Sequence, residues 1–519
     1  MAFFGFHPHH EGLMLATLNL TSDAIRTGES LPFNQYGPFW TLPYLTMELL
    51  PLGGFTFLAQ RFVSILLIFL SALMIRRISL VFFSRNTSLV IASLFLVTYP
   101  YGQPSIIWPS IPAQLALLVL TYSILQTIDS PKQIHILVAG LSTIFLLGSR
   151  IQIGFLSVLC TIAIFSLTRN FVSLARYVAF VALVSTLIFV ILQSQGLVED
   201  IIFDSFVFPF TYLDPNQQNW TLPRTSIVVG ISLFVFFFAL NRINNEKGIS
   251  RIPLLVLAAL FLGLLFSQFV NESIYLKAYA RLYVGLFLFI TTVLLFSLAR
   301  NFKRRCTQFA LETVLYLYSL VGAFQVFPLF DAFHAWYAST PLLIALPLIF
   351  RESTFMLRLR RKTLSVWMFS ILLTCLALFG AQAAQSISNV PKPFPLQDVR
   401  GIFLTAKQAS DLEKEFILFK SNIPKRAKVM NFCSNADPFF TRSYWSPASR
   451  FFVFWSAFSD SPLVERGLME ADFVTICTAV TELNDTSQRI LETTFSKVGT
   501  GSDIYSWGLE WEIYKRNAN

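Results

Sequence analysis

Hydrophobic and polar positions divide the chain into two parts with different patterns. Up to about residue 383, long apolar runs alternate with short polar connections, and the runs approach the length of about 20 residues that a helix needs to cross a membrane. The apolar runs lie near residues 57–75, 87–100, 111–127, 134–149, 151–168, 177–195, 225–241, 252–270, 281–299, 309–327, 335–350 and 363–383. This pattern predicts a mainly α protein, a polytopic bundle of about twelve transmembrane helices.

The pattern changes after about residue 384. The stretch "AQSISNVPKPFP" ends the last apolar run with two prolines, and we expect a linker there. Residues 405–423 have helical apolar spacing, while short apolar runs at 427–433, 450–455 and 472–478 predict buried strands. Residues 384–519 are therefore expected to form a small α/β domain. Two of these runs end with Cys433 and Cys477, for which two buried thiols are favoured over a disulfide.

Composition and charge support membrane insertion and give it a direction. The chain has 55% hydrophobic and 13% charged residues, which is too apolar for an ordinary soluble surface. The net charge of +10 comes mainly from Lys and Arg in every second connection, which the positive-inside rule places in the cytoplasm. The excess is thus a topology signal, and no nucleic-acid partner is expected. Segments 1–45 and 384–519 then lie outside, so the N-terminus requires either a translocated tail or a further helix encoded before Met1.

Polar residues gather on the predicted outer side. The segment "HPHHEG" (7–12) holds three of the five histidines together with Glu11. Cations occur where outer loops enter apolar runs, at Arg150, Lys277 and Arg281, which is a costly depth for a charge unless an anion compensates it. Tyr36, Gln152, Asp331 and His334 lie in the same outer segments. Such a set fits group transfer from a phosphate-linked lipid, because cations hold the leaving phosphate and a carboxylate accepts the proton of an acceptor hydroxyl.

A divalent metal is an alternative use of the histidine cluster. The ligands would be His9, His10 and Glu11, and the metal would serve the same phosphate. The spacing lacks the i, i+4 pair of a helical metal site, so metal binding is the less favoured hypothesis. No other cofactor is expected.

The segment "HHEGLMLATLNLTSDAIRTGESLPFNQYGPFWTLPYL" (9–45) resembles the first outer loop of bacterial membrane proteins of the GT-C glycosyltransferase superfamily, related to the protein mannosyltransferase and aminoarabinose transferase group. The matching positions are His10, Glu11, Gly12, Ala16, Gly28, Pro32, Tyr36, Gly37 and Pro38. "RIQIG" (150–154) and "FPLFDAFHAWYASTP" (327–341) are similar to later segments of such proteins.

The resemblance implies a GT-C-like domain over 46–383 and a multi-pass protein of a bacterial inner membrane. It implies sugar transfer on the non-cytoplasmic face, from a polyprenyl-phosphate-linked donor to a glycan, lipid or protein acceptor. The displacement would invert the sugar, with Glu11 as the general base beside His10. Arg150, Gln152, Lys277, Arg281, Asp331, His334 and Tyr36 would then bind the substrate and its phosphate.

Two other functions are compatible with the pattern. A transporter or flippase of lipid-linked saccharides would place ionisable groups near the membrane midplane on broken helices of paired halves, and no such repeat is visible. A lipid-linked glycan ligase or polymerase would share the basic cleft. The concentration of polar residues on one side favours the glycosyltransferase.

Overall fold

The structure is a computed structural model that describes the following parts of the chain. These are residues 11–28, 31–34, 36–46, 57–98, 107–208, 307–326, 340, 344–345, 348, 392–393, 402–433, 435–440, 444–454, 458, 461–477, 483–502 and 510–518.

The described part of the chain before residue 327 is mainly helical. Its helices are α1 (Leu13–Thr27), the short η2 (Pro38–Thr41) and α2 (Leu42–Leu45), α3 (Phe57–Phe82), α4 (Arg85–Thr98), α5 (Ser110–Asp129), α6 (Gln133–Ser149), α7 (Ile151–Leu167), α8 (Phe171–Ser194), α9 (Val198–Ile202), η4 (Phe203–Val207), α14 (Thr307–Ala323) and η6 (Phe324–Val326). Among the described helices, α3, α5 and α8 are long and apolar enough to cross a membrane, and shorter apolar helices accompany them.

The predicted helices are confirmed as far as the described residues reach. Seven of the predicted runs coincide with α3 to α8 and with α14. The predicted runs near 225–241, 252–270, 281–299, 335–350 and 363–383 lie wholly or largely outside the described residues. The total of about twelve spans therefore stays a prediction.

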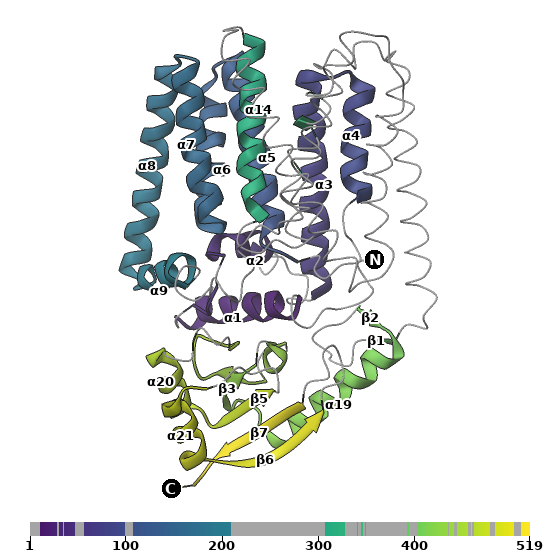
Figure 1. Cartoon of the computed structure of the whole chain (residues 1–519), viewed down its shortest axis with the longest axis vertical. Coiled ribbons are helices and arrows are strands. Elements are labelled where there is room, and N and C mark those ends of the chain that lie inside the picture. Colours follow the sequence, from purple (N-terminus) through teal and green to yellow (C-terminus); the bar gives the residue numbers. More distant parts are fainter. Residues whose placement is uncertain are drawn as a thin grey trace, which may run out of the picture.

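The long helices run side by side, and α1 lies across one end of them (Figure 1). We call this the lower end, where α3 and α5 begin and α6 passes into α7. Helix α1 is buried along most of its length, because the bundle lies above it and the C-terminal residues lie below it (Figure 1). It ends at Gly28, whose left-handed backbone (φ 73°) caps the helix.

Residues 392–518, which we call the C-terminal unit, contain a five-stranded sheet of order β4-β3-β5-β7-β6 and a separate pair, β1 with β2. Its elements are β1 (Lys392–Pro393), β2 (Phe403–Leu404), α19 (Ala406–Asn422), β3 (Lys428–Phe432), η8 (Asp437–Phe439), β4 (Ser446–Pro447), α20 (Pro462–Glu470), β5 (Phe473–Cys477), α21 (Asp485–Thr494), β6 (Phe495–Ser502) and β7 (Glu510–Arg516). Strand β3 is parallel to β4 and β5, while β7 is antiparallel to β5 and β6.

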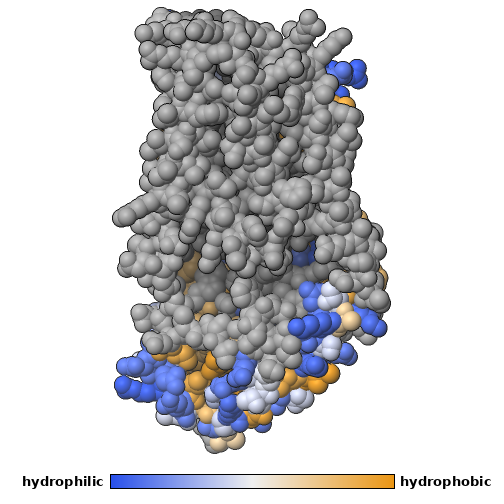
Figure 2. Space-filling view, turned by 45° about the vertical axis from the view of Figure 1, so that its right-hand side comes forward, coloured by the Kyte–Doolittle hydropathy of each residue, from blue (hydrophilic) through white to orange (hydrophobic). Residues whose placement is uncertain are grey.

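Alternate residues of β3 enter different hydrophobic clusters. Met430 and Phe432 pack with residues of α20 and α21, whereas Val429 belongs to the cluster that contains residues of α19. The period of two places helices on both faces of the sheet. The predicted helix at 405–423 is confirmed as α19, and two of the three predicted strands are confirmed as β3 and β5. The surface of this unit mixes hydrophilic and hydrophobic residues (Figure 2).

The third predicted strand, at 450–455, is wrong. Its described residues form no strand, although Phe451 and Phe452 are buried. The backbone of this run makes hydrogen bonds outside the sheet. The Arg450 carbonyl accepts from the amide of Phe33, and the Phe454 amide donates to the carbonyl of Cys433. An apolar run without alternation predicts burial but not the partner of its backbone, and here burial comes from packing between two parts of the protein.

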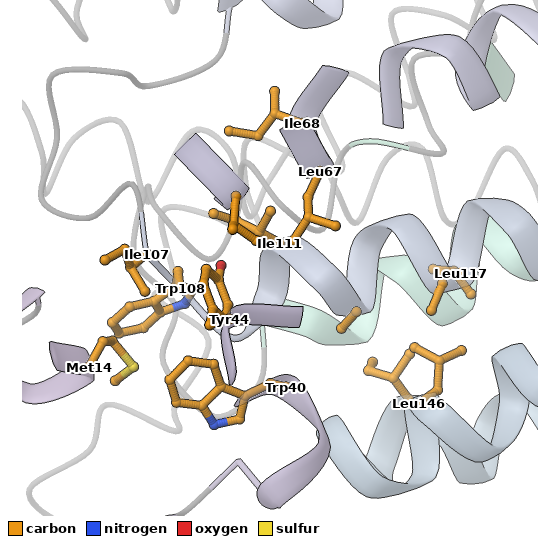
Figure 3. Close-up of a cluster of buried hydrophobic side chains, with 14 of the residues drawn as sticks. Met14, Trp40, Tyr44, Leu67, Ile68, Ile107, Trp108, Ile111, Leu117 and Leu146 are labelled. Carbon is orange, nitrogen blue, oxygen red and sulfur yellow. The ribbon is translucent and has the colours of Figure 1, made fainter. Parts of the chain in front are cut away.

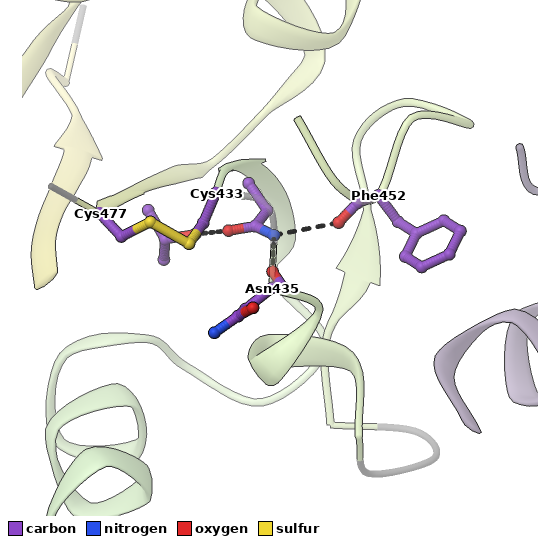
Figure 4. Close-up of a disulfide and its surroundings, with 6 residues drawn as sticks. Cys433, Asn435, Phe452 and Cys477 are labelled. Carbon is purple, nitrogen blue, oxygen red and sulfur yellow. Dashed lines mark hydrogen bonds between the residues drawn. A yellow bond between two sulfur atoms is a disulfide. The ribbon is translucent and has the colours of Figure 1, made fainter. Parts of the chain in front are cut away.

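The prediction of two free thiols is also wrong. Cys433 and Cys477 form a disulfide, and both are buried at the ends of the neighbouring strands β3 and β5. Figure 4 shows the hydrogen bonds beside it, in which the buried Asn431 amide donates to the carbonyls of Asn435 and Phe452. Parallel pairing of β3 with β5 brings the two cysteines together, and sequence separation alone could not indicate this.

Candidate active site at the lower end of the bundle

Glu11 directly precedes Gly12 and α1, and its side chain is buried against α3. The carboxylate accepts two hydrogen bonds from Arg61, at 2.7 Å from Nη2 and 3.2 Å from Nε. The two side chains are 4% and 2% exposed, so the ion pair is withdrawn from solvent. The guanidinium also lies over the ring of Phe57, 4.6 Å from its centroid and one helical turn earlier on α3. A bidentate pair of this kind fixes the direction in which the carboxylate points.

An apolar and aromatic cluster packs beside this part of the chain (Figure 3). Trp40 and Tyr44 contact each other edge to face, with ring centroids 5.8 Å apart, and both are fully buried. The hydroxyl of Tyr44 is 2.9 Å from that of Ser64 on α3, and Met14 of α1 reaches the same cluster. The cluster attaches α1 and the loop that follows it to the start of α3.

Arg150 stands at the junction of α6 and α7, where the chain turns at the lower end. It is buried, and it donates through Nη2 to the hydroxyl of Ser110 at the start of α5. Its guanidinium lies over the ring of Tyr36, 4.9 Å from the centroid, and Tyr36 packs edge to face on Trp108. A second cation is therefore held at the same end of the bundle as Glu11, among aromatic rings and a hydroxyl.

Asn34 organises the loop that carries Tyr36. Its side-chain oxygen accepts from Trp40 Nε1 at 3.0 Å and from the amide of Tyr36 at 3.2 Å, while its Nδ2 donates to the carbonyl of Gly37 at 3.1 Å. Its backbone amide donates to Asp204 at 2.9 Å. One side chain thus fixes the turn, and the turn places the Tyr36 ring against Arg150.

The same loop approaches the end of α6 more closely than a side chain would allow. Gly37 has φ 81°, and a Cβ at this position would lie 2.5 Å from the carbonyl oxygen of Gly148. A Cβ on Gly148 would in turn overlap the ring of Phe39. The "YGP" sequence therefore needs its glycine for both conformation and space.

Asp204, in η4 after α8, connects this loop to the C-terminal unit. Its carboxylate accepts from Arg450 Nη2 at 2.6 Å and from the amide of Asn34, and Asp200 is 3.3 Å from Arg450 Nη1. Burial raises the pKa of Asp204 to about 6, although the charge of Arg450 opposes the shift. Phenylalanines from the first loop, from the residues around η4 and from the C-terminal unit pack around these ion pairs. The ring centroids of Phe33 and Phe208 are 4.9 Å apart.

The predicted site residues have different outcomes. The structure brings Glu11, Arg150 and Tyr36 to the lower end, but Gln152 is exposed on α7 while its neighbour Arg150 is buried. His9, His10, Lys277, Arg281, Asp331 and His334 lie outside the described residues. The stretches that the structure places contain no group of three or more His, Cys, Asp or Glu side chains arranged to hold a metal. The metal hypothesis, which depends on His9 and His10, stays a prediction.

Arg61 is the residue that sequence reasoning missed. Its signal was present: one guanidinium stands four positions into an otherwise apolar run, where an ionisable residue is unusual and generally paired. The partnership of Asp204 with Arg450 had no such signal, because the two residues are 246 positions apart and no pattern in the sequence links them.

No protein-family model and no curated protein matches the chain. Among solved structures, it is similar to crystal structures of the oligosaccharyltransferase of Archaeoglobus fulgidus. For the complex with zinc and sulfate, identity is 12% and the TM-score is 0.46, with 89% of this chain and 63% of that chain covered. For the apo form the values are 11%, 0.47, 91% and 66%, so this chain spans less than two thirds of the archaeal chain's length. At such values the likeness does not establish a shared fold.

Proposed function

We propose that this protein is an integral membrane glycosyltransferase that transfers a sugar from a polyprenyl-phosphate-linked donor to an acceptor on the non-cytoplasmic face of a bacterial membrane. One observation carries the proposal. The carboxylate of the H-E-G motif, Glu11, is buried at one end of an apolar helical bundle as a bidentate ion pair with Arg61. A buried ionisable pair at a membrane-protein surface is costly to maintain and generally serves function.

Glu11 acts as the general base in this proposal. Arg61 donates one hydrogen bond to each oxygen of the Glu11 carboxylate. Arg61 keeps the group oriented while an acceptor hydroxyl approaches it. As the acceptor oxygen bonds to the anomeric carbon, the sugar–phosphate bond breaks, the hydroxyl proton passes to Glu11 and the phosphate leaves with the bonding electrons. Attack from the side opposite the phosphate inverts the anomeric centre.

Arg150 holds the leaving phosphate. A guanidinium offers paired N–H donors that match phosphate oxygens, and a site shielded from water strengthens this contact. Ser110 and the ring of Tyr36 fix the side chain at the lower end, which is the membrane-surface end by the predicted topology. Lys277, Arg281, Asp331, His334 and His10 complete the site on the basis of their predicted outer positions and of the family resemblance. A divalent metal at His9, His10 and Glu11 would have to share the carboxylate with Arg61.

The disulfide supports the proposed side of the membrane. Disulfides persist in oxidising compartments such as the bacterial periplasm, and the Cys433–Cys477 bond belongs to the unit below α1. With this unit outside, the lower end of the bundle and Glu11 face outward too.

The test uses the full-length protein in lipid nanodiscs with polyprenyl-phosphate-linked hexoses and pentoses that carry a radioactive sugar. Membrane extract supplies the acceptor, and incorporation of label is measured. We expect Glu11→Gln to lose transfer by a factor on the order of 10² or more while still binding donor. Glu199→Gln, an exposed carboxylate of α9, is the matched control and should transfer normally. Absence of transfer by the natural protein with every donor, or normal transfer by Glu11→Gln, would contradict the proposal.

A further inference from the structure

Gln60 on α3 is a buried amide with no partner. Its side chain is 0% exposed, and neither Nε2 nor Oε1 has a hydrogen-bond partner in the part of the chain that the structure describes. An amide withdrawn from water without compensating hydrogen bonds costs free energy, so native proteins rarely leave one in this state. Such an exception at a proposed active site indicates a group that bonds to a ligand.

The position of Gln60 relates it to the proposed base. It directly precedes Arg61, whose guanidinium holds Glu11, and it stands one helical turn before Ser64. Residues four apart lie on the same face of a helix, so Gln60 and Ser64 share a side of α3. Ser64 is engaged by the Tyr44 hydroxyl at 2.9 Å. The unpartnered amide therefore belongs to the residue next to Arg61 in the chain, on the side of α3 from which Ser64 meets the aromatic cluster.

The chemistry of an amide limits what it can recognise. Nε2 donates two hydrogen bonds and Oε1 only accepts, so a complete partner must offer an acceptor and a donor close together. A phosphate diester presents acceptors alone and would leave Oε1 unsatisfied. A sugar hydroxyl does both, because its oxygen accepts while its proton is donated, and neighbouring hydroxyls on a ring can serve both amide atoms.

We propose that Gln60 binds a hydroxyl of the sugar carried by the lipid-linked donor and so contributes to sugar selectivity. The inference rests on the proposed function. In an inverting displacement the transferred sugar stands between the base and the leaving phosphate, so a residue next to the holder of the base can reach the sugar ring. Gln60 recognises the sugar, while Arg150 holds the phosphate.

The test separates sugar from phosphate with soluble donor analogues. Farnesyl phosphate and its mannose, glucose, galactose and arabinose conjugates are titrated against the full-length protein in nanodiscs. Gln60→Leu keeps the approximate volume and removes both polar atoms. We expect it to bind bare farnesyl phosphate like the natural protein and to lose on the order of tenfold affinity for the preferred conjugate. Because the amide makes no bond to the described residues, the variant should melt no lower without ligand.

Gln126→Leu is the matched control, since Gln126 is a half-buried glutamine near the opposite end of a neighbouring membrane helix, α5. It should leave both affinities unchanged. If the natural protein discriminates among sugars and Gln60→Leu does so equally, the Gln60 assignment is wrong and the proposed function stands. An equal loss for bare phosphate and conjugates, or a raised acceptor KM with unchanged donor binding, also overturns the assignment. If the natural protein binds none of these molecules, both proposals fail.

Discussion

Asp204 and Arg450 are 246 positions apart in the chain, yet their side chains form a 2.6 Å ion pair. Around it, the carbonyl of Arg450 accepts from the amide of Phe33, and Asp204 accepts from the amide of Asn34. Three segments meet there: the first loop, η4 and the C-terminal unit. The loop that positions Tyr36 against Arg150 is thereby hydrogen-bonded to Asp204 on one side and to the C-terminal unit on the other.

Arg450→Met tests how much this junction contributes to stability. The two side chains are 7% and 6% exposed, and removing one partner of a buried pair costs about 3 kcal/mol or more. We expect a matching loss of unfolding free energy, measured by denaturant titration of the detergent-solubilised protein. Lys497→Met is the control, because Lys497 pairs with Glu512 at an exposed position and should change stability by about 0.5 kcal/mol or less. Equal effects of the two substitutions would contradict the role of the junction.

The raised pKa of Asp204 predicts a pH dependence of stability. Burial is the largest cause of the shift from 3.8 to about 6, so between these values the folded protein binds a proton that the unfolded chain has released. Stability contributed by Asp204 is therefore fully present below about pH 4 and is lost as pH rises through about 6, by about 2–3 kcal/mol in total. Asp204→Asn should flatten this decline in a comparison of unfolding at pH 4 and pH 7. An unchanged slope would show that Asp204 does not titrate in this range.

Much of the helical part was predictable because it depends on local composition. An apolar run of about 20 residues has few alternatives to a membrane helix, and the observed helices follow the predicted runs closely. Strands β3 and β5 were predictable for a similar reason, since each is a short β-branched and aromatic run between turn residues.

The errors concern partners that are distant in sequence. The run at 450–455 is as apolar as a strand, but its backbone bonds to Phe33 and Cys433 instead of a sheet neighbour. The disulfide depends on the parallel register of β3 with β5. The pairing of Glu11 with Arg61, 50 positions away, was not predicted either. No periodicity in the sequence encodes such pairings.

Gly37→Ala tests whether the close approach of the first loop to α6 is needed. The left-handed backbone would be strained by any side chain, and the added Cβ would also meet the carbonyl of Gly148. Gly28→Ala is the matched control, because Gly28 has φ 73° but open space around it. We expect about 1 kcal/mol of destabilisation for the control and clearly more for Gly37→Ala, together with loss of donor affinity as Tyr36 is displaced from Arg150. Equal losses would mean that the contact with Gly148 is unimportant.

Reduction of the Cys433–Cys477 disulfide should destabilise the C-terminal unit. The bond closes a loop of 44 residues, and chain-entropy arguments give about 3–4 kcal/mol for a loop of this length. The double substitution Cys433→Ala, Cys477→Ala should show the same loss in thermal unfolding, and reductant should then have no further effect. If reductant still lowered the thermal stability of the double variant, its effect would not come from the Cys433–Cys477 bond and the prediction would be wrong. Cys160 is the one free cysteine among the described residues.

The Glu11–Arg61 pair allows stability and chemistry to be separated. Glu11→Gln alone removes a bonded counter-charge from a buried guanidinium and should cost about 3–5 kcal/mol, and Arg61→Gln should cost a similar amount by removing a bonded cation from the buried carboxylate. When both are replaced, both charges of the pair are removed together, so the double variant should recover most of the lost stability. Thermal unfolding of the four proteins gives the coupling free energy.

Transfer activity in the same four proteins then decides the role of Glu11. If Glu11 accepts the acceptor's proton, the double variant is folded and binds donor, yet its turnover stays reduced by a factor on the order of 10² or more. Glu11→Asp, which keeps the charge, should restore part of the turnover because a carboxylate remains within reach of the acceptor. Recovery of transfer by the double variant would instead assign the pair a purely structural role, since the carboxylate would be absent while activity returned.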